Sequence, residues 1–140
     1  MNEFVLDTSV ILKWFSNVGE SDLDQALHLR EELLNGSVLF TVPELLFYEM
    51  ANALRYNPAF SSKDVEAAVN SVLEMGLEVR TVEQETLAEA INLAFKYSST
   101  VYDTYFLALS RKEGKALITA DYRFTEKLKG VRGIIKLSDV

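Results

Sequence analysis

Short apolar runs alternate with longer segments along the 140-residue chain, and in the longer segments apolar residues recur every three or four positions. The short runs are typical of buried strands, and the longer periodic segments are typical of amphipathic helices. The predicted strands cover residues 3–6, 38–42, 77–82, 115–119 and 133–137, and the predicted helices cover 9–15, 23–34, 44–56, 61–75, 83–97, 101–113 and 122–128. This alternation predicts one α/β domain over residues 1–140, with a parallel sheet covered by helices on both faces.

Local signals mark several boundaries of these elements. Pro43 suits the first turn of a helix, and Gly36 and Gly114 fall where C-terminal caps are expected. Ser21, with Asp24 three residues further on, matches an acidic variant of the capping box, so we expect Ser21 to begin the second helix.

Two aspartates directly follow predicted strands. Asp7 comes after the first strand and Asp121 after the fourth, and Thr119 closes that fourth strand. Ligand sites of parallel sheets lie at the carboxyl ends of the strands, so both aspartates are candidates for chemistry. The structural alternative for each is an N-cap of the following helix, where Asp is common.

Glu49 lies inside a helix with apolar residues on nearly every side, which predicts a largely buried carboxylate. Carboxylates are rarely buried unless they are paired or bound to a metal ion. Asn52 shares the face of Glu49 and is placed to hold this carboxylate or a bound water. The alternative is an ion pair with Arg55 or Lys13.

Asp103 begins another largely apolar helix, three residues after Thr100, and this spacing also fits a structural cap. Four carboxylates from separate segments would repel one another if they converged, and protons or hard cations would relieve that repulsion. Mg²⁺ and Mn²⁺ prefer oxygen ligands. The residues by themselves therefore support an acidic metal site, although spacing alone does not show convergence.

Composition limits the classes that remain. The chain is 49% hydrophobic and has no Cys, which excludes disulfides and thiolate chemistry. We expect a cytoplasmic protein, because no apolar run approaches the roughly 20 residues of a membrane span.

The net charge is −7, but residues 96–140 carry nine basic and five acidic residues. That basic third could face phosphate, and Arg123, close to Asp121, is the best single candidate for binding a substrate phosphate.

Four segments together resemble the PIN domain family, most closely its VapC-type toxins. The segments are Phe4–Phe15, Glu49–Leu54, Tyr102–Leu109 and Leu117–Phe124, and they occur in the family's order and spacing over essentially the whole chain. Each segment alone is a weak signal, and the four in order are fairly specific.

The resemblance implies a five-stranded parallel sheet of order 3-2-1-4-5 and a metal-dependent endoribonuclease. It implies that Mg²⁺ or Mn²⁺ is bound by four carboxylates, those of Asp7, Glu49, Asp103 and Asp121. It places Ser9, Asn52 and Thr119 where they support ligands or water. Members of the family cleave RNA, often transfer RNA, by metal-activated water, are typically homodimers, and are usually blocked by a VapB-type antitoxin.

Other functions compete with this interpretation. PIN domains also serve in RNA processing, and an acidic cleft without catalysis could capture a basic partner. Haloacid-dehalogenase-like phosphatases also use an Asp after the first strand, but they carry a second Asp two residues later, where this chain has Ser9. A receiver-type signalling module would need paired acidic residues after that strand and a Lys late in the sheet, and neither is clear here.

Overall fold

The computed structural model describes residues 1–16 and 19–140, and its five strands form one sheet in the order β3-β2-β1-β4-β5. All neighbouring strands are parallel, which confirms the predicted fold class and strand order. The strands are β1 (Asn2–Leu6), β2 (Val38–Pro43), β3 (Glu78–Arg80), β4 (Ala116–Thr119) and β5 (Ile134–Lys136). The helices are α1 (Thr8–Leu12), α2 (Leu23–Leu34), α3 (Leu45–Arg55), α4 (Ser62–Leu73), α5 (Gln84–Tyr97), α6 (Val101–Glu113), α7 (Tyr122–Lys127) and the 3₁₀ turn η1 (Leu137–Asp139).

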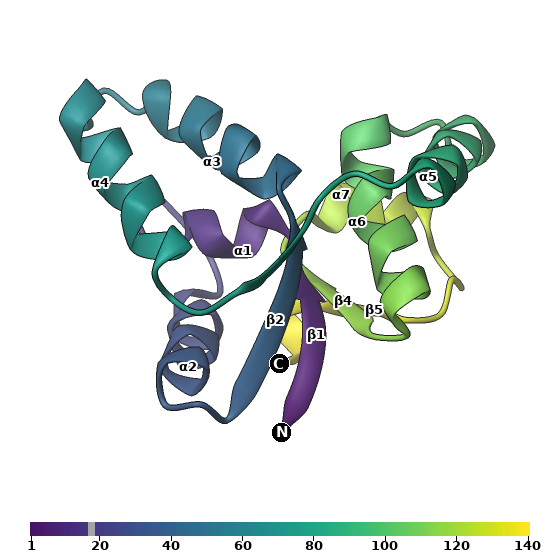
Figure 1. Ribbon diagram of the computed structural model, residues 1–140, viewed down its shortest axis with the longest axis horizontal. Helices are drawn as coiled ribbons and strands as arrows, with labels where there is room; N and C mark the ends of the chain where they lie inside the picture. The colour runs from purple at the N-terminus through teal and green to yellow at the C-terminus, as the bar shows by residue number, and fades with distance from the viewer. Residues whose placement is uncertain (17–18) are drawn as a thin grey trace.

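Helices cover the sheet on both sides. In Figure 1, α1 to α4 lie on one side of the central strands, and α5 and α6 lie on the other. The central strands are accordingly buried on both faces: Val5 and Leu6 of β1, Phe40 of β2 and Leu117 of β4 have no exposed surface. This double burial explains why these strands read as continuous apolar runs rather than alternating ones.

The register of β1 and β4 sets where the chain leaves the sheet. Leu6 lies opposite Ile118, and the backbone N–H of Asp7 donates to the carbonyl of Ile118 at 3.0 Å. Asp7 and the residues after β4 therefore lie side by side at one edge. Because β1 has β2 on one side and β4 on the other, this edge is the switch point at which ligand sites of parallel sheets form.

Most predicted elements match within two residues, but the predicted Ser21 cap is wrong. The N-cap of α2 is Asp22, in the left-handed region at φ 57°, and its side chain makes no capping hydrogen bond. Long-range contacts override the local signal here. The Tyr122 hydroxyl donates to the Asp22 carboxylate at 2.5 Å, and the ammonium of Lys13 donates to the Ser21 carbonyl at 2.9 Å.

Two further differences concern element lengths. The first helix ends at Leu12 rather than at Phe15, and β3 covers only Glu78–Arg80 of the predicted strand over residues 77–82. No helix within residues 1–16 and 19–140 is long and apolar enough to cross a bilayer.

Candidate functional site

Asp7 is fixed at the end of β1 by three hydrogen bonds to its carboxylate. Its Oδ2 accepts from the Ser9 N–H at 3.2 Å, from the Ser9 hydroxyl at 2.5 Å and from the Thr119 hydroxyl at 3.1 Å. The bond from the Ser9 N–H caps α1. Capping and a role in a site are therefore compatible, because one carboxylate has lone pairs enough for both.

Ser9 and Thr119 join the ends of β1 and β4. The Ser9 hydroxyl accepts from the Ala120 N–H at 2.9 Å, and the buried Thr119 hydroxyl accepts from the Asp121 N–H at 3.1 Å. The two hydroxyl oxygens are 3.3 Å apart. These bonds fix the Asp7 carboxylate relative to the backbone of the first two residues after β4.

Asp121 and Asp103 both lie at helix starts. The Asp121 Oδ1 accepts from the Phe124 N–H at 3.1 Å and so caps α7. Asp103 lies in the first turn of α6, whose cap is the Thr100 hydroxyl accepting from the Asp103 N–H at 3.1 Å. The cap of α6 uses the backbone of Asp103, which leaves its carboxylate oxygens outside that bond.

Glu49 is held by a hydroxyl rather than by a cation. Its Oε1 accepts from the Thr8 hydroxyl at 2.7 Å. The ion pair considered from the sequence is not formed, because Lys13 pairs with Glu20 at 2.7 Å and the Arg55 guanidinium lies over the ring of Tyr56. Nor is α3 buried all round: its buried face holds Leu46, Met50 and Leu54, while Tyr48 is 69% exposed.

One cleft of about 290 Å³ contains all four predicted acidic residues, and we call it the acidic cleft. Its lining is Asp7, Thr8, Ser9, Leu12, Glu49, Asn52, Ala53, Asp103 and Asp121. None of these residues is basic. Asn52, exposed on α3, also lines the cleft. Thr119 is buried and is not part of the lining, and Arg123 is exposed on α7 outside the lining.

Sequence reasoning missed Thr8. Its hydroxyl follows a sheet-edge aspartate directly, and that position was the available signal. The contact of Thr8 with α3 depends on tertiary structure, since 41 residues separate Thr8 from Glu49.

Burial and mutual repulsion disfavour negative charge in the acidic cleft. Burial raises the pKa of Asp7 to about 6, and the charge of Asp103 adds to this, while hydrogen bonds from Ser9 and Thr119 oppose it. Burial also raises the pKa of Glu49 to about 7, with Asp7 and Asp103 adding and the Thr8 hydroxyl opposing. The pKa of Asp103 is raised by burial first and by the charge of Asp121 second.

The donor set fits a hard divalent cation by its chemistry. It consists of carboxylate oxygens with hydroxyl and amide oxygens beside them, which is the ligand type preferred by Mg²⁺ and Mn²⁺. The raised pKa values show that the hydrogen bonds from Ser9, Thr119 and Thr8 do not offset the full cost of burying negative charge in the cleft. Within residues 1–16 and 19–140, no three acidic or imidazole side chains are already arranged around one ion position.

Comparisons with known proteins agree with this fold. The family model of the PIN domain matches residues 4–129. Ribonuclease VapC3 of Pyrobaculum aerophilum is 34% identical over 89 residues, which cover 60% of this chain and 67% of that protein. The chain therefore belongs to the PIN domain family, and the predicted resemblance to VapC-type members is confirmed.

Solved structures show the same fold at low identity. The crystal structure of DNA-bound VapBC from Salmonella typhimurium contains a chain with a TM-score of 0.69 and 18% identity, with coverage of 98% of this chain and 99% of that one. VapC20 of Mycobacterium tuberculosis, described as a sarcin-ricin loop cleaving toxin, gives a TM-score of 0.67 and 17% identity, with coverage of 89% and 95%.

The raised carboxylate pKa values predict that the metal-free protein loses stability as pH rises. A carboxylate with a raised pKa binds its proton more tightly in the folded state than in the unfolded state, so the gain is present at low pH and is lost between about pH 4 and 7. We expect the free energy of unfolding in EDTA to be on the order of 1–2 kcal/mol higher at pH 5 than at pH 7.5. Urea unfolding at the two pH values measures this difference.

Asp7→Asn should reduce this difference, because asparagine keeps the capping oxygen but does not titrate. Glu85→Gln, which changes an exposed carboxylate of α5, is the matched control and should leave the difference unchanged. Equal stability of the wild type at pH 5 and pH 7.5 would contradict the electrostatic description of the cleft.

Proposed function

We propose that this protein is a metal-dependent endoribonuclease and the toxin of a VapBC-type toxin–antitoxin pair. The observation that carries the proposal is that four carboxylates, two just after β1 and β4 and two on α3 and α6, line one cleft without a basic residue. The PIN domain match and the relative named Ribonuclease VapC3 support it. We propose that it acts in the cytoplasm, because the chain has no Cys and because the proposed substrate is RNA.

In this proposal the four carboxylates bind one or two Mg²⁺ or Mn²⁺ ions. A bound ion of this kind lowers the pKa of water and offsets negative charge on a phosphodiester. The protein's own contribution is positional. Ser9 and Thr119 keep the Asp7 carboxylate facing the cleft, and Asn52 offers an exposed amide at the cleft to hold water. No side chain becomes covalently attached to the RNA.

Cleavage of a labelled RNA pool by purified protein tests the proposal. We expect cleavage with Mn²⁺ or Mg²⁺, none with EDTA, and a loss of at least about 100-fold in Asp7→Asn, since the charge is lost while the shape is kept. Glu85→Gln should cleave like the wild type.

Activity that persists in Asp7→Asn would indicate a contaminating nuclease. Absence of cleavage, together with absence of Mn²⁺ binding in calorimetry, would leave a PIN fold that acts as a binding module for a basic partner. Cleavage without growth arrest on expression would favour an RNA-processing role over a toxin.

Arg123 is proposed to bind a phosphate of the RNA beside the cleft. It is exposed, it lies two residues after Asp121, and it belongs to the basic C-terminal third. Two other cations of that third, Arg111 and Lys112, are paired with Glu89 and Glu83 respectively. We expect Arg123→Ala to raise KM several-fold with a smaller change in kcat and to weaken the salt dependence of binding. Arg132→Ala, also exposed, is the control, and equal effects of the two variants would argue against a specific role.

A VapB-type antitoxin is the proposed protein partner. Several of the similar folds come from toxin–antitoxin assemblies, including the VapBC complex from Salmonella typhimurium. The negative charge of the acidic cleft favours a basic segment in any partner that covers it. The proposal for the partner rests on these two points together.

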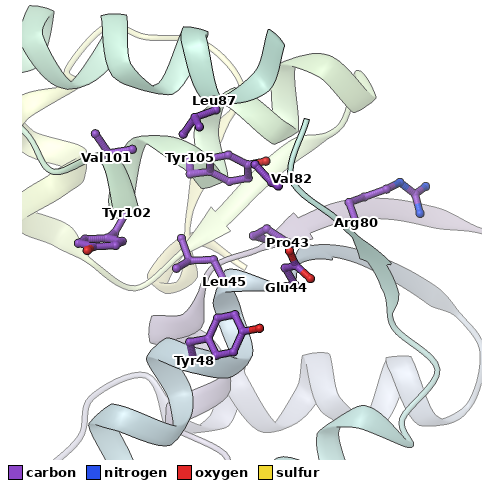
Figure 2. Close-up of a pocket in the computed structure, with 10 residues that line it drawn as sticks. All are labelled: Pro43, Glu44, Leu45, Tyr48, Arg80, Val82, Leu87, Val101, Tyr102 and Tyr105. Atoms are coloured by element: carbon purple, nitrogen blue, oxygen red, sulfur yellow. The ribbon is translucent and has the colours of Figure 1, made fainter. Parts of the chain in front are cut away.

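A homodimer through the outer face of α5 is proposed as well. Leu87, Ile91 and Phe95 are spaced four residues apart and so share one helix face, and Phe95 is 84% exposed. Figure 2 shows that Leu87 also borders a groove of about 250 Å³, lined by Tyr48 of α3 and Tyr102 of α6 among others. Exposed apolar side chains gathered on one face are typical of protein–protein contacts.

Light scattering tests the dimer. We expect the wild type to have twice the mass of one chain and Phe95→Asp to have the mass of one, because a charge on this face opposes its burial. Leu34→Asp, which changes a residue that is 56% exposed on α2, is the matched control. A monomeric wild type at micromolar concentration would exclude a stable dimer.

A further inference from the structure

The Glu49 carboxylate depends on one hydroxyl group. Within residues 1–16 and 19–140, its hydrogen-bond partner is Thr8, whose Oγ1 donates to Oε1 at 2.7 Å. The Asp7 carboxylate, by contrast, accepts from three donors on Ser9 and Thr119. The network that fixes Asp7 comes from the sheet edge and from the first residues of α1, and it does not include Glu49, which α3 supplies.

Thr8 is built to hold that contact. It is the first residue of α1, its side chain is only 6% exposed, and it lines the acidic cleft between Asp7 and Ser9. Branching at Cβ restricts its side chain to few rotamers, so the hydroxyl has a defined direction. Glu49 has three rotatable side-chain bonds and is only partly buried, so without the Thr8 hydroxyl its carboxylate has other orientations open to it.

We infer that Thr8 is a positioning residue, which acts through Glu49 to hold the α3 carboxylate toward the other three. This inference rests on the proposed metal site. Ser9 and Thr119 orient the Asp7 side of the cleft, and Thr8 orients the Glu49 side. Two consecutive residues at the start of α1, Thr8 and Ser9, thus orient one carboxylate from α3 and one from the sheet edge.

Calorimetric titration with Mn²⁺ tests the inference on three proteins. Thr8→Val keeps the shape of the side chain and removes the donor, and we expect a loss in affinity of about 10-fold or more, as is typical for a group that orients a metal ligand. Thr8→Ser keeps the donor and should stay within about three-fold of the wild type. If Thr8→Val does not fold, as judged by circular dichroism, Thr8→Ala replaces it.

A second comparison asks whether Thr8 acts through Glu49. In a Glu49→Ala background there is no carboxylate for Thr8 to orient, so Thr8→Val should then change the Mn²⁺-induced shift in melting temperature by little. Thr86→Val is the control for replacing a buried threonine. The Thr86 hydroxyl, on α5, has no hydrogen-bond partner in the described part of the chain, and its removal should leave Mn²⁺ affinity unchanged.

The outcomes separate this inference from the proposed function. Failure of the wild type to bind Mn²⁺ would overturn the metal site and the role of Thr8 with it. Wild-type binding with equal affinity in Thr8→Val would overturn the role of Thr8 alone. Equal losses in Thr8→Ser and Thr8→Val, or a loss that persists in the Glu49→Ala background, would also overturn it.

Discussion

Four carboxylates cannot be brought into one partly buried cleft unless the fold opposes both their repulsion and their loss of water. The junction between β1 and β4 meets this requirement. The backbone bond from Asp7 to Ile118 sets the two strand ends level, and hydroxyls of Ser9 and Thr119 then donate to the Asp7 carboxylate while accepting backbone N–H groups beyond β4. Each of the two hydroxyls donates one bond and accepts another, so the sheet edge is both satisfied and rigid. The positions of α1 and α7 follow from it, because both helices begin there.

The protein's own cations offset this charge only in part: Lys127 lowers the pKa of Asp103, but no basic residue lines the cleft. Lys13 is buried a short distance along the chain from Asp7, yet its ammonium is used by Glu20 and by the carbonyl of Ser21. Had Lys13 paired with Glu49, the cleft would carry one negative charge fewer and would attract a divalent ion less strongly. The raised pKa values of Asp7 and Glu49 are the cost of this arrangement in the metal-free state. Raised pKa values that are concentrated at one place in an otherwise well-satisfied fold are typical of functional sites.

Helix capping and the site use the same residues without conflict. A first-turn aspartate lies next to unsatisfied backbone N–H groups, which stabilise its negative charge. Asp7 and Asp121 accept such bonds, and both still line the cleft. From the sequence these roles were alternatives, because residue type and spacing give the helix start but not the direction in which the second carboxylate oxygen points. The spatial relation to Asp103 and Glu49 decides that, and it arises only when α3 and α6 pack on either side of the sheet edge.

The sequence by itself determined the elements, their order and the placement of Asp7 and Asp121 at strand ends, because these depend on hydrophobic periodicity and on short-range geometry. Resemblance to a family, rather than physics, indicated the strand order and that the four acidic residues form one site. Tertiary structure alone decided that Thr8 holds Glu49 and that Lys13 pairs with Glu20. It also decided that α2 follows Asp22, which bonds to Tyr122, instead of being capped by Ser21, and that α3 is exposed at Tyr48. These are contacts between segments distant in sequence or choices among nearby partners. Local patterns carry no information about them, because the partner of a side chain is fixed only by the packing of whole elements.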